Sequence, residues 1–153
     1  MSDKPLRRRL ELILRGGAVK RYHNCPMRGT QTVAEHSAGV AWLCVLLTPR
    51  PRAVLLLAAL QHDLPEAIVG DLPSPAKRSL SKAARKELKI AERRALRTHG
   101  HRPYEGLLTA PERHILKVAD ILEGQLRCAH EMRLGNRYAG EIAVRYVSYI
   151  NAL

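Results

Sequence analysis

Aromatic residues are scarce in this 153-residue sequence, which contains no Phe and a single Trp, Trp42. Surfaces that bind single-stranded nucleic acid usually stack bases on aromatic side chains, so this scarcity argues against such a surface. No apolar run is long enough to span a bilayer, and residues 1–9 lead into no secretory signal region. We therefore expect a cytoplasmic protein with no membrane partner.

Cysteine is also rare, with only three residues: Cys25, Cys44 and Cys128. An odd number without paired spacing does not indicate a disulfide framework. Cys44 and Cys128 lie in apolar-periodic stretches and are expected in the core, whereas Cys25 lies in a predicted loop. The length fits one domain over residues 1–153, built on one core.

Acidic residues are outnumbered, with 14 Asp and Glu against 26 Lys and Arg, which gives a formal net charge of +12. A charge of this size raises the local concentration of polyanions. The basic residues are scattered, and they lack zinc-finger spacing, an RNA-recognition motif or a recognition-helix pattern. We therefore favour a nucleotide partner over nucleic acid, with a basic nucleic-acid-binding helical module as the alternative.

Nearly every extended stretch repeats its apolar residues with a helical period, which predicts an all-α helical bundle. Helices are expected over about residues 3–15, 33–47, 52–63, 81–98, 109–134 and 139–151. The segment 64–75 contains three Pro and a Gly, so it is too broken for a long helix and suits a rigid cleft wall. In the first helix the residues expected to face inward are Leu6, Leu10, Ile13 and Leu14.

The helix expected over 109–134 carries an apolar stripe that should face the core. Its members are Ile115, Val118, Ala119, Leu122, Leu126 and Ala129. Asp120 falls on the flank of this stripe. We expect Glu123, Arg127 and His130 to form a solvated or interfacial face, with an ion pair between Glu123 and Arg127.

Four potential metal ligands stand out in the sequence: His36, the adjacent pair His62 and Asp63, and the distant Asp120. Two imidazoles and two carboxylates can hold one divalent cation and leave positions open for water and substrate. A capping-box pattern at Thr32–Glu35 places His36 near a helix start, and the pair at 62–63 ends an apolar run. Three helices could therefore converge on one ion.

Each ligand also has a simpler interpretation. His36 could be a partly buried histidine near a helix start. Asp63 and Glu66 could form a capping box of their own. Asp120 could pair with Lys117, which lies three residues earlier on the same helix surface.

The order of these motifs resembles that of the HD-domain phosphohydrolases, in particular their nucleotide-cleaving branch. The resemblance covers roughly residues 18–125 and rests on four segments: Arg21-Tyr22-His23, Thr32-Val33-Ala34-Glu35-His36-Ser37, His62-Asp63-Leu64-Pro65-Glu66 and Gly70-Asp71-Leu72-Pro73-Ser74-Pro75-Ala76-Lys77. That branch includes bacterial 5′-deoxynucleotidases and short phage enzymes that remove triphosphate from deoxynucleotides, notably from dATP.

The resemblance implies that the metal ligands are His36, His62, Asp63 and Asp120. Their donor atoms suit Zn, Co, Mn or Fe, with Mg a candidate for a second site. The resemblance also implies catalytic roles: Glu66 for general acid and base chemistry, and Arg21 and Lys77 for holding the phosphates. For both cations the alternative is ordinary surface charge.

Four further residues are implied in substrate binding. Tyr22 stands where similar enzymes often have Trp, and it keeps an aromatic face for the sugar or base. Asp71 matches a position that contacts a sugar hydroxyl, although a loop N-cap is an even alternative. His23 and Asn24 could line the base pocket.

The sequence therefore predicts a metal-dependent phosphohydrolase that cleaves the 5′-phosphoester of deoxynucleotides. The preferred substrate is a dNTP, with dATP first, which would yield deoxynucleoside and triphosphate. Hydrolysis of dNMP is the alternative. We also expect a homo-oligomer, in which apolar flanks of the last two helices are buried, and a host-cytoplasmic location if the chain is phage-encoded.

Overall fold

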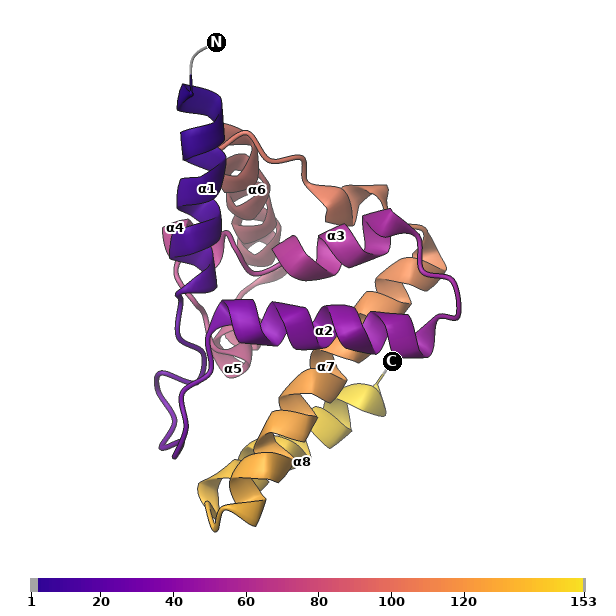
Figure 1. Cartoon of the computed structure of the whole chain (residues 1–153). Helices are drawn as coiled ribbons and strands as arrows, with labels where there is room; N and C mark the ends of the chain where they lie inside the picture. The colour runs from indigo at the N-terminus through magenta and orange to yellow at the C-terminus, as the bar shows by residue number, and fades with distance from the viewer. Residues whose placement is uncertain (1–2, 153) are drawn as a thin grey trace.

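The computed structural model describes residues 3–152, and every regular element in that range is helical. Met1, Ser2 and Leu153, at the ends of the predicted domain, lie outside the described residues. The helices, shown in Figure 1, are α1 (Lys4–Gly17), α2 (Val33–Leu47), α3 (Ala53–Gln61), α4 (Glu66–Val69), α5 (Ser74–Ser79), α6 (Lys82–Thr98), the 3₁₀ helix η1 (Tyr104–Leu107), α7 (Ala110–Arg133) and α8 (Tyr138–Ile150). The predicted all-α fold is confirmed.

The helix starts follow local capping chemistry. Thr32 accepts a hydrogen bond from the backbone N–H of Glu35, whose side chain in turn accepts from the Thr32 N–H, so the predicted capping box opens α2. Thr109 and Glu112 open α7 in the same way. In the broken segment 64–75 the structure adds α4 and the start of α5, which are too short to produce a periodic signal.

The main core lies where α2, α3 and α7 meet. Its buried residues include Val40 and Cys44 of α2, Leu55 of α3 and Ala119 of α7. Cys128 is also fully buried, so both predicted core cysteines are confirmed. In Figure 1, α2 crosses in front of α7, and α8 runs back along α7 toward the core. Helix α7 therefore packs on α2 with one side and on α8 with another.

The predicted inward face of α1 is wrong. Leu6, Leu10, Ile13 and Leu14 are all exposed, Leu14 to 72%, and the buried residues of α1 are instead Leu12 and Gly16. A Cβ at Gly16 would lie 2.6 Å from the carbonyl oxygen of Leu64, so the helix docks through its smallest residue. Close approach at this point turns the larger apolar side chains outward.

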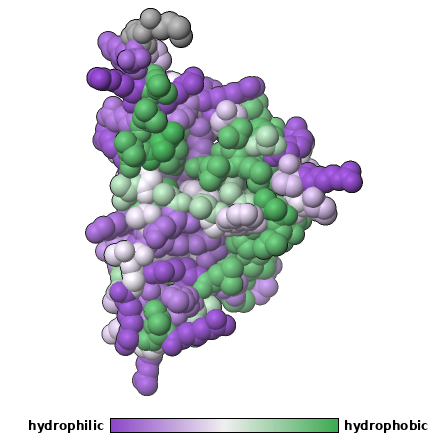
Figure 2. All heavy atoms as spheres, in the orientation of Figure 1, coloured by the Kyte–Doolittle hydropathy of each residue, from purple (hydrophilic) through white to green (hydrophobic). Residues whose placement is uncertain are grey.

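Exposed apolar side chains gather over α1 and over α2 and α3, as Figure 2 shows. Those on α2 include Trp42, Leu46 and Leu47. Contiguous apolar surface of this kind commonly marks an interaction site. None of the described helices combines the length and apolar character that crossing a membrane would require.

The predicted stripe of α7 is only partly correct. Ala119 is buried, but Leu126 is 59% exposed, and the buried positions also include Leu116, Ile121 and Cys128. A single-face interpretation fails because α7 has two packing partners. Asp120 and Glu123 of α7 both approach His36 of α2.

A buried carboxylate holds the loop that follows Arg21. Glu131 of α7 is fully buried and accepts hydrogen bonds from the backbone N–H groups of Arg28 (2.8 Å) and Gly29 (3.0 Å). The Asn136 amide (2.9 Å) and the Arg127 guanidinium (3.0 Å) also donate to it. The predicted Glu123–Arg127 pair is therefore wrong, because Arg127 pairs with Glu131.

We expect Glu131→Gln to lower the free energy of unfolding by about 2 kcal/mol at neutral pH, because a neutral amide cannot satisfy the same donors. The Asn136 hydrogen bond, with those from Arg28 and Gly29, lowers the pKa of Glu131 to about 2 against the effect of burial. The stabilisation is thus complete above the unfolded-state pKa near 4.3 and is lost as pH falls toward 2. Urea melts of both proteins between pH 7 and pH 3 measure this. If the difference in unfolding free energy between the two proteins did not shrink in acid, this prediction would be wrong.

Candidate active site

Two imidazoles approach each other from α2 and from the end of α3. His36 is fully buried, and its Nδ1 donates to the Glu123 carboxylate, which leaves the Nε2 lone pair free. His62, at the C-cap of α3, donates from Nδ1 to the Ala59 carbonyl at 2.7 Å. Its ring is therefore oriented like that of His36, with Nδ1 bonded and Nε2 without a partner. The ring centroids are 5.3 Å apart, and both Nε2 atoms are buried without a hydrogen-bond partner. Buried polar atoms are rarely left unpaired, so these two nitrogens are suited to binding a ligand between the rings.

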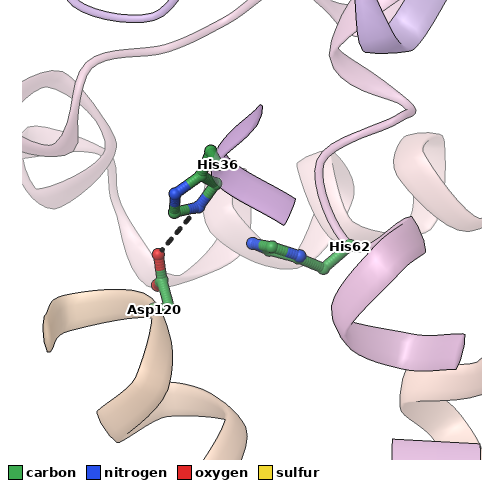
Figure 3. A group of neighbouring side chains, drawn as sticks. All are labelled: His36, His62 and Asp120. Atoms are coloured by element: carbon green, nitrogen blue, oxygen red, sulfur yellow. Dashed lines mark ion pairs between the residues drawn. The ribbon is translucent and has the colours of Figure 1, made fainter. Parts of the chain in front are cut away.

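Two carboxylates complete the cluster. Asp63 Oδ2 lies 3.5 Å from His36 Nε2 and 3.4 Å from His62 Nε2, and Asp120 Oδ1 lies 3.4 Å from His36 Nε2. Figure 3 shows His36, His62 and Asp120 pointing toward one another from three helices. Donor atoms of these three lie within 4.8 Å of one another, close enough to hold a metal ion. Nitrogen and oxygen donors of this kind fit Zn²⁺ and similar divalent ions.

The charge state of both carboxylates agrees with a cation site. Burial by itself would raise the pKa of each. For Asp63 the two nearby imidazoles outweigh burial, and for Asp120 the close contact with His36 and the Lys117 charge do so, so both pKa values are lowered. Ionised carboxylate oxygens and imidazole nitrogens are suitable metal ligands.

The structure excludes the capping role considered for Asp63 and confirms the ion pair considered for Asp120. Asp63 makes no capping hydrogen bond, because α4 has Pro65 as its N-cap without a side-chain cap. Asp120 does pair with Lys117, through Oδ2 at 2.8 Å, while its Oδ1 faces His36. The ion pair and the metal role are therefore compatible.

Glu123 contacts this cluster, although its position in the sequence predicted a solvated residue. Its carboxylate is 12% exposed and accepts from His36 Nδ1, from Gln31 Nε2 at 2.6 Å and from Arg21 at 3.1 Å. The expected solvated face at Glu123 is therefore wrong. Its spacing of three residues from Asp120 was the available signal, because residues i and i+3 share a helix face.

We expect Glu123→Gln to weaken metal binding by about 10- to 100-fold, the usual effect of losing a partner that orients a ligating histidine. Metal titration followed by calorimetry measures this. Glu87→Gln, an exposed carboxylate on α6, is the charge-matched control. Equal metal affinity in the two variants would remove Glu123 from the site.

Glu66, at the start of α4, is buried beside the cluster. One carboxylate oxygen accepts from Lys77 Nζ at 3.2 Å, and the other is buried without a hydrogen-bond partner. Burial, followed by the nearby charge of Asp63, raises the pKa of Glu66 to about 8 although Lys77 opposes the shift. A carboxyl group that stays protonated at neutral pH can act as a general acid.

A cavity of about 220 Å³ opens beside these groups and is lined by Asp63, Asp120, Glu66 and Lys77. Three of the predicted substrate residues also line it: Tyr22, Asn24 and Asp71. His23 does not; its Nδ1 contacts Asp71 Oδ2 at 3.1 Å. Arg21 lines the cavity too, although its guanidinium is shared with Gln31 and Glu123.

Helix α8 forms a further wall of the cavity, where the sequence analysis predicted only closing packing. Ile142, Arg145, Tyr146 and Tyr149, which share one helix face, line the cavity. A Cβ on Gly124 would lie 2.3 Å from Tyr146 Cζ, so a glycine on α7 makes room for this ring. No periodic signal in the sequence marks a face that is half packed and half open.

The loop after α1 reaches α8 through two tyrosines. Tyr22 is the one non-glycine residue with a positive φ, 56°, among the described residues. Its hydroxyl is hydrogen-bonded to that of Tyr146 at 2.9 Å, and Arg21 lies over its ring at 5.2 Å. Left-handed backbone at such a residue is costly and often accompanies a functional constraint.

The sequence is similar to that of a known protein family over most of its length. The profile of the family described as "5'-deoxynucleotidase YfbR-like" matches residues 8–153. No curated protein matches the sequence significantly.

Several solved structures share the fold. An HD-domain phosphohydrolase from Listeria innocua has a TM-score of 0.76 at 18% identity, covering 96% of this chain and 80% of that one. The PH0347 protein from Pyrococcus horikoshii OT3 has a TM-score of 0.71 at 20% identity, covering 93% and 94%. The cyanophage S-2L HD phosphohydrolase DatZ, bound to dA and one catalytic Zn²⁺ ion, has a TM-score of 0.65 at 23% identity, covering 88% and 82%. At these identities the likeness concerns the fold.

Proposed function

The chain belongs to the YfbR-like 5′-deoxynucleotidase family and has the fold of HD-domain phosphohydrolases, and we propose that it hydrolyses the 5′-phosphoester of deoxynucleotides. The observation that carries this proposal is the meeting of two groups at one cavity. The His and Asp cluster supplies unpaired donor atoms for a cation, and Glu66 supplies a buried proton donor beside it.

In this proposal His36, His62, Asp63 and Asp120 hold the metal ion. A divalent ion bound there would act as a Lewis acid on the phosphoryl group. Zn²⁺ is the ion in the DatZ structure, and the same donors also accept Co, Mn or Fe. Mg²⁺ stays our candidate for a second site.

The protein's own groups then handle the proton and the phosphate charge. Glu66, protonated at neutral pH, donates to the leaving 5′-oxygen of the sugar, which is a poor leaving group as an alkoxide. Lys77 keeps its charge because nearby acidic groups, among them the ionised Asp63, raise its pKa against the effect of burial, so it can face a phosphate. Arg21 offers a planar, permanently charged donor set at the same wall.

The sugar and base would occupy the remaining cavity. Asp71 accepts a hydrogen bond from a deoxyribose hydroxyl, and His23 holds that carboxylate in place. Tyr22 offers its ring, and Asn24 an amide that can donate and accept.

Two substrates are compatible with this site. We propose a dNTP, with dATP preferred, because the chain carries strong positive charge and DatZ was solved with dA. The family description names a 5′-deoxynucleotidase, and this favours a dNMP as the second candidate.

Product analysis distinguishes the candidates. Metal-loaded protein is incubated with each dNTP and each dNMP, and the products are separated by chromatography. Triphosphate with free deoxynucleoside supports the dNTP proposal, whereas orthophosphate from dNMPs alone establishes the second candidate. No turnover of either set, combined with salt-dependent DNA or RNA binding, would instead support a nucleic-acid-binding module.

We further propose that the chain forms a homo-oligomer. The sequence placed the contact on the last two helices, but α1 and α2 also expose large apolar residues, including Leu14, Trp42 and Leu46. Burial of such residues favours association. Sedimentation velocity measures the state directly, and a monomer at micromolar concentration would contradict this proposal.

A further inference from the structure

The cavity is lined by four side chains with permanent or near-permanent positive charge, and three of them have an acidic partner. Arg21 binds Glu123, Lys77 binds Glu66 and Lys117 binds Asp120, each within 3.2 Å. Arg145 of α8 is the exception: within residues 3–152 it has no ion pair, and its side chain is exposed. Its charge is thus available to a ligand.

The position of Arg145 is fixed by its neighbours. Tyr146 is seated against Gly124 of α7 and is hydrogen-bonded to Tyr22, which sets the rotation of α8. One turn later Tyr149 also lines the cavity, and the guanidinium of Arg78 from α5 lies 3.5 Å from the centre of its ring. Arg145 therefore lines the α8 wall of the cavity, and Arg78 lies against the ring of Tyr149, which belongs to the same wall.

The cavity carboxylates do not compete for this charge. Asp63 and Asp120 face the imidazole cluster, Glu66 faces Lys77, and Asp71 faces His23. Each of these cavity carboxylates thus has a partner of its own, and Glu141, one turn before Arg145 on α8, is exposed and does not line the cavity.

We propose that Arg145 binds the phosphates of a deoxynucleotide that lie beyond the one being cleaved, with Arg78 as a second cation at the same wall. This inference rests on the proposed function, because it assumes that the first phosphate lies at the His and Asp cluster. A volume of about 220 Å³ is below the roughly 300 Å³ at which ligand sites usually begin. The outer part of a triphosphate must therefore extend over the rim, where Arg145 is exposed. Arginine suits this task because its fork of donors matches phosphate oxygens.

The test compares dATP with dAMP in the same protein. Binding of each nucleotide is measured by calorimetry in metal-loaded Glu66→Gln protein, so that turnover does not disturb the titration. The variants Arg145→Gln and, as control, Arg85→Gln are made in this background. Arg85 is an exposed arginine on α6 that does not line the cavity, so its loss removes the same net charge elsewhere.

We expect Arg145→Gln to weaken dATP about tenfold and to leave dAMP within about twofold, because only dATP has outer phosphates. Arg85→Gln should leave the ratio of the two affinities unchanged. An unchanged ratio in Arg145→Gln, or an equal change in both variants, would overturn the inference. Product analysis is separate: hydrolysis of dNMPs alone refutes the dNTP proposal, while the affinity ratio still decides the role of Arg145.

Discussion

Replacing His62 with Ala should lower hydrolysis of the preferred deoxynucleotide by about a thousandfold and reduce bound metal in parallel. The expected loss corresponds to several kcal/mol of transition-state stabilisation, the amount that a Lewis acid typically supplies. His62 is suited to this test because its Nε2 is buried, unpaired and adjacent to Asp63. Its removal takes away one ligand and leaves the main core intact. Metal content by atomic absorption and the rate of product formation are the two measurements.

The chain offers a closely matched control in His99→Ala. His99 also caps the end of a helix, α6, and its Nδ1 donates to the Ala95 carbonyl at 2.8 Å. Any general cost of removing a histidine from a helix end is therefore common to both variants. If His99→Ala lost metal and activity to the same degree, the effect of His62→Ala would be structural, and the cluster would not be the metal site.

Glu66→Gln should lower kcat by about 10³-fold, within the range for loss of a general acid, while metal binding stays near that of the unchanged protein. The amide matches the shape of the carboxyl group and can still contact Lys77, but it has no proton to give to a leaving alkoxide. Rate measurements combined with metal titration separate this role from ligation. Loss of metal together with activity would contradict the proton-donor role and make Glu66 part of the cation site.

The pH profile gives a second readout for Glu66. Because burial and the charge of Asp63 raise its pKa to about 8, the acid form predominates below that pH and disappears above it. The rate should therefore be high near neutrality and fall as pH rises through about 8. Glu66→Gln should abolish this alkaline limb and keep a low, flat rate. A limb that persists unchanged in the variant would assign the titration to another group.

The sequence predicted which residues meet at the cluster better than it predicted the residues around them. His36, His62 and Asp120 came from motif order, and the structure brings all three together. The ends of α2 were also predictable, because its capping box and the prolines after it are local signals. Features of this kind can be predicted from the sequence because they depend on residues that are close together in the chain.

Other features could not be predicted from the sequence, because they depend on contacts between elements that are far apart in the chain. Glu123 has the pattern of a solvated residue until α2 and the loop containing Gln31 pack against it. Leu14 fits an inward stripe, yet the approach of Gly16 to Leu64 turns it outward. Helical periodicity identifies an apolar face, but it does not tell which partner covers that face.

The hydrogen bond between Tyr22 and Tyr146 joins residues 124 positions apart, and Arg21 and Glu123 are separated by 102. During synthesis the loop that carries Tyr22 leaves the ribosome long before α8 exists. The nascent chain therefore has no complete nucleotide pocket until its last helix has emerged and docked. Since loop closure over such distances delays folding, acquisition of activity should lag behind formation of the individual helices.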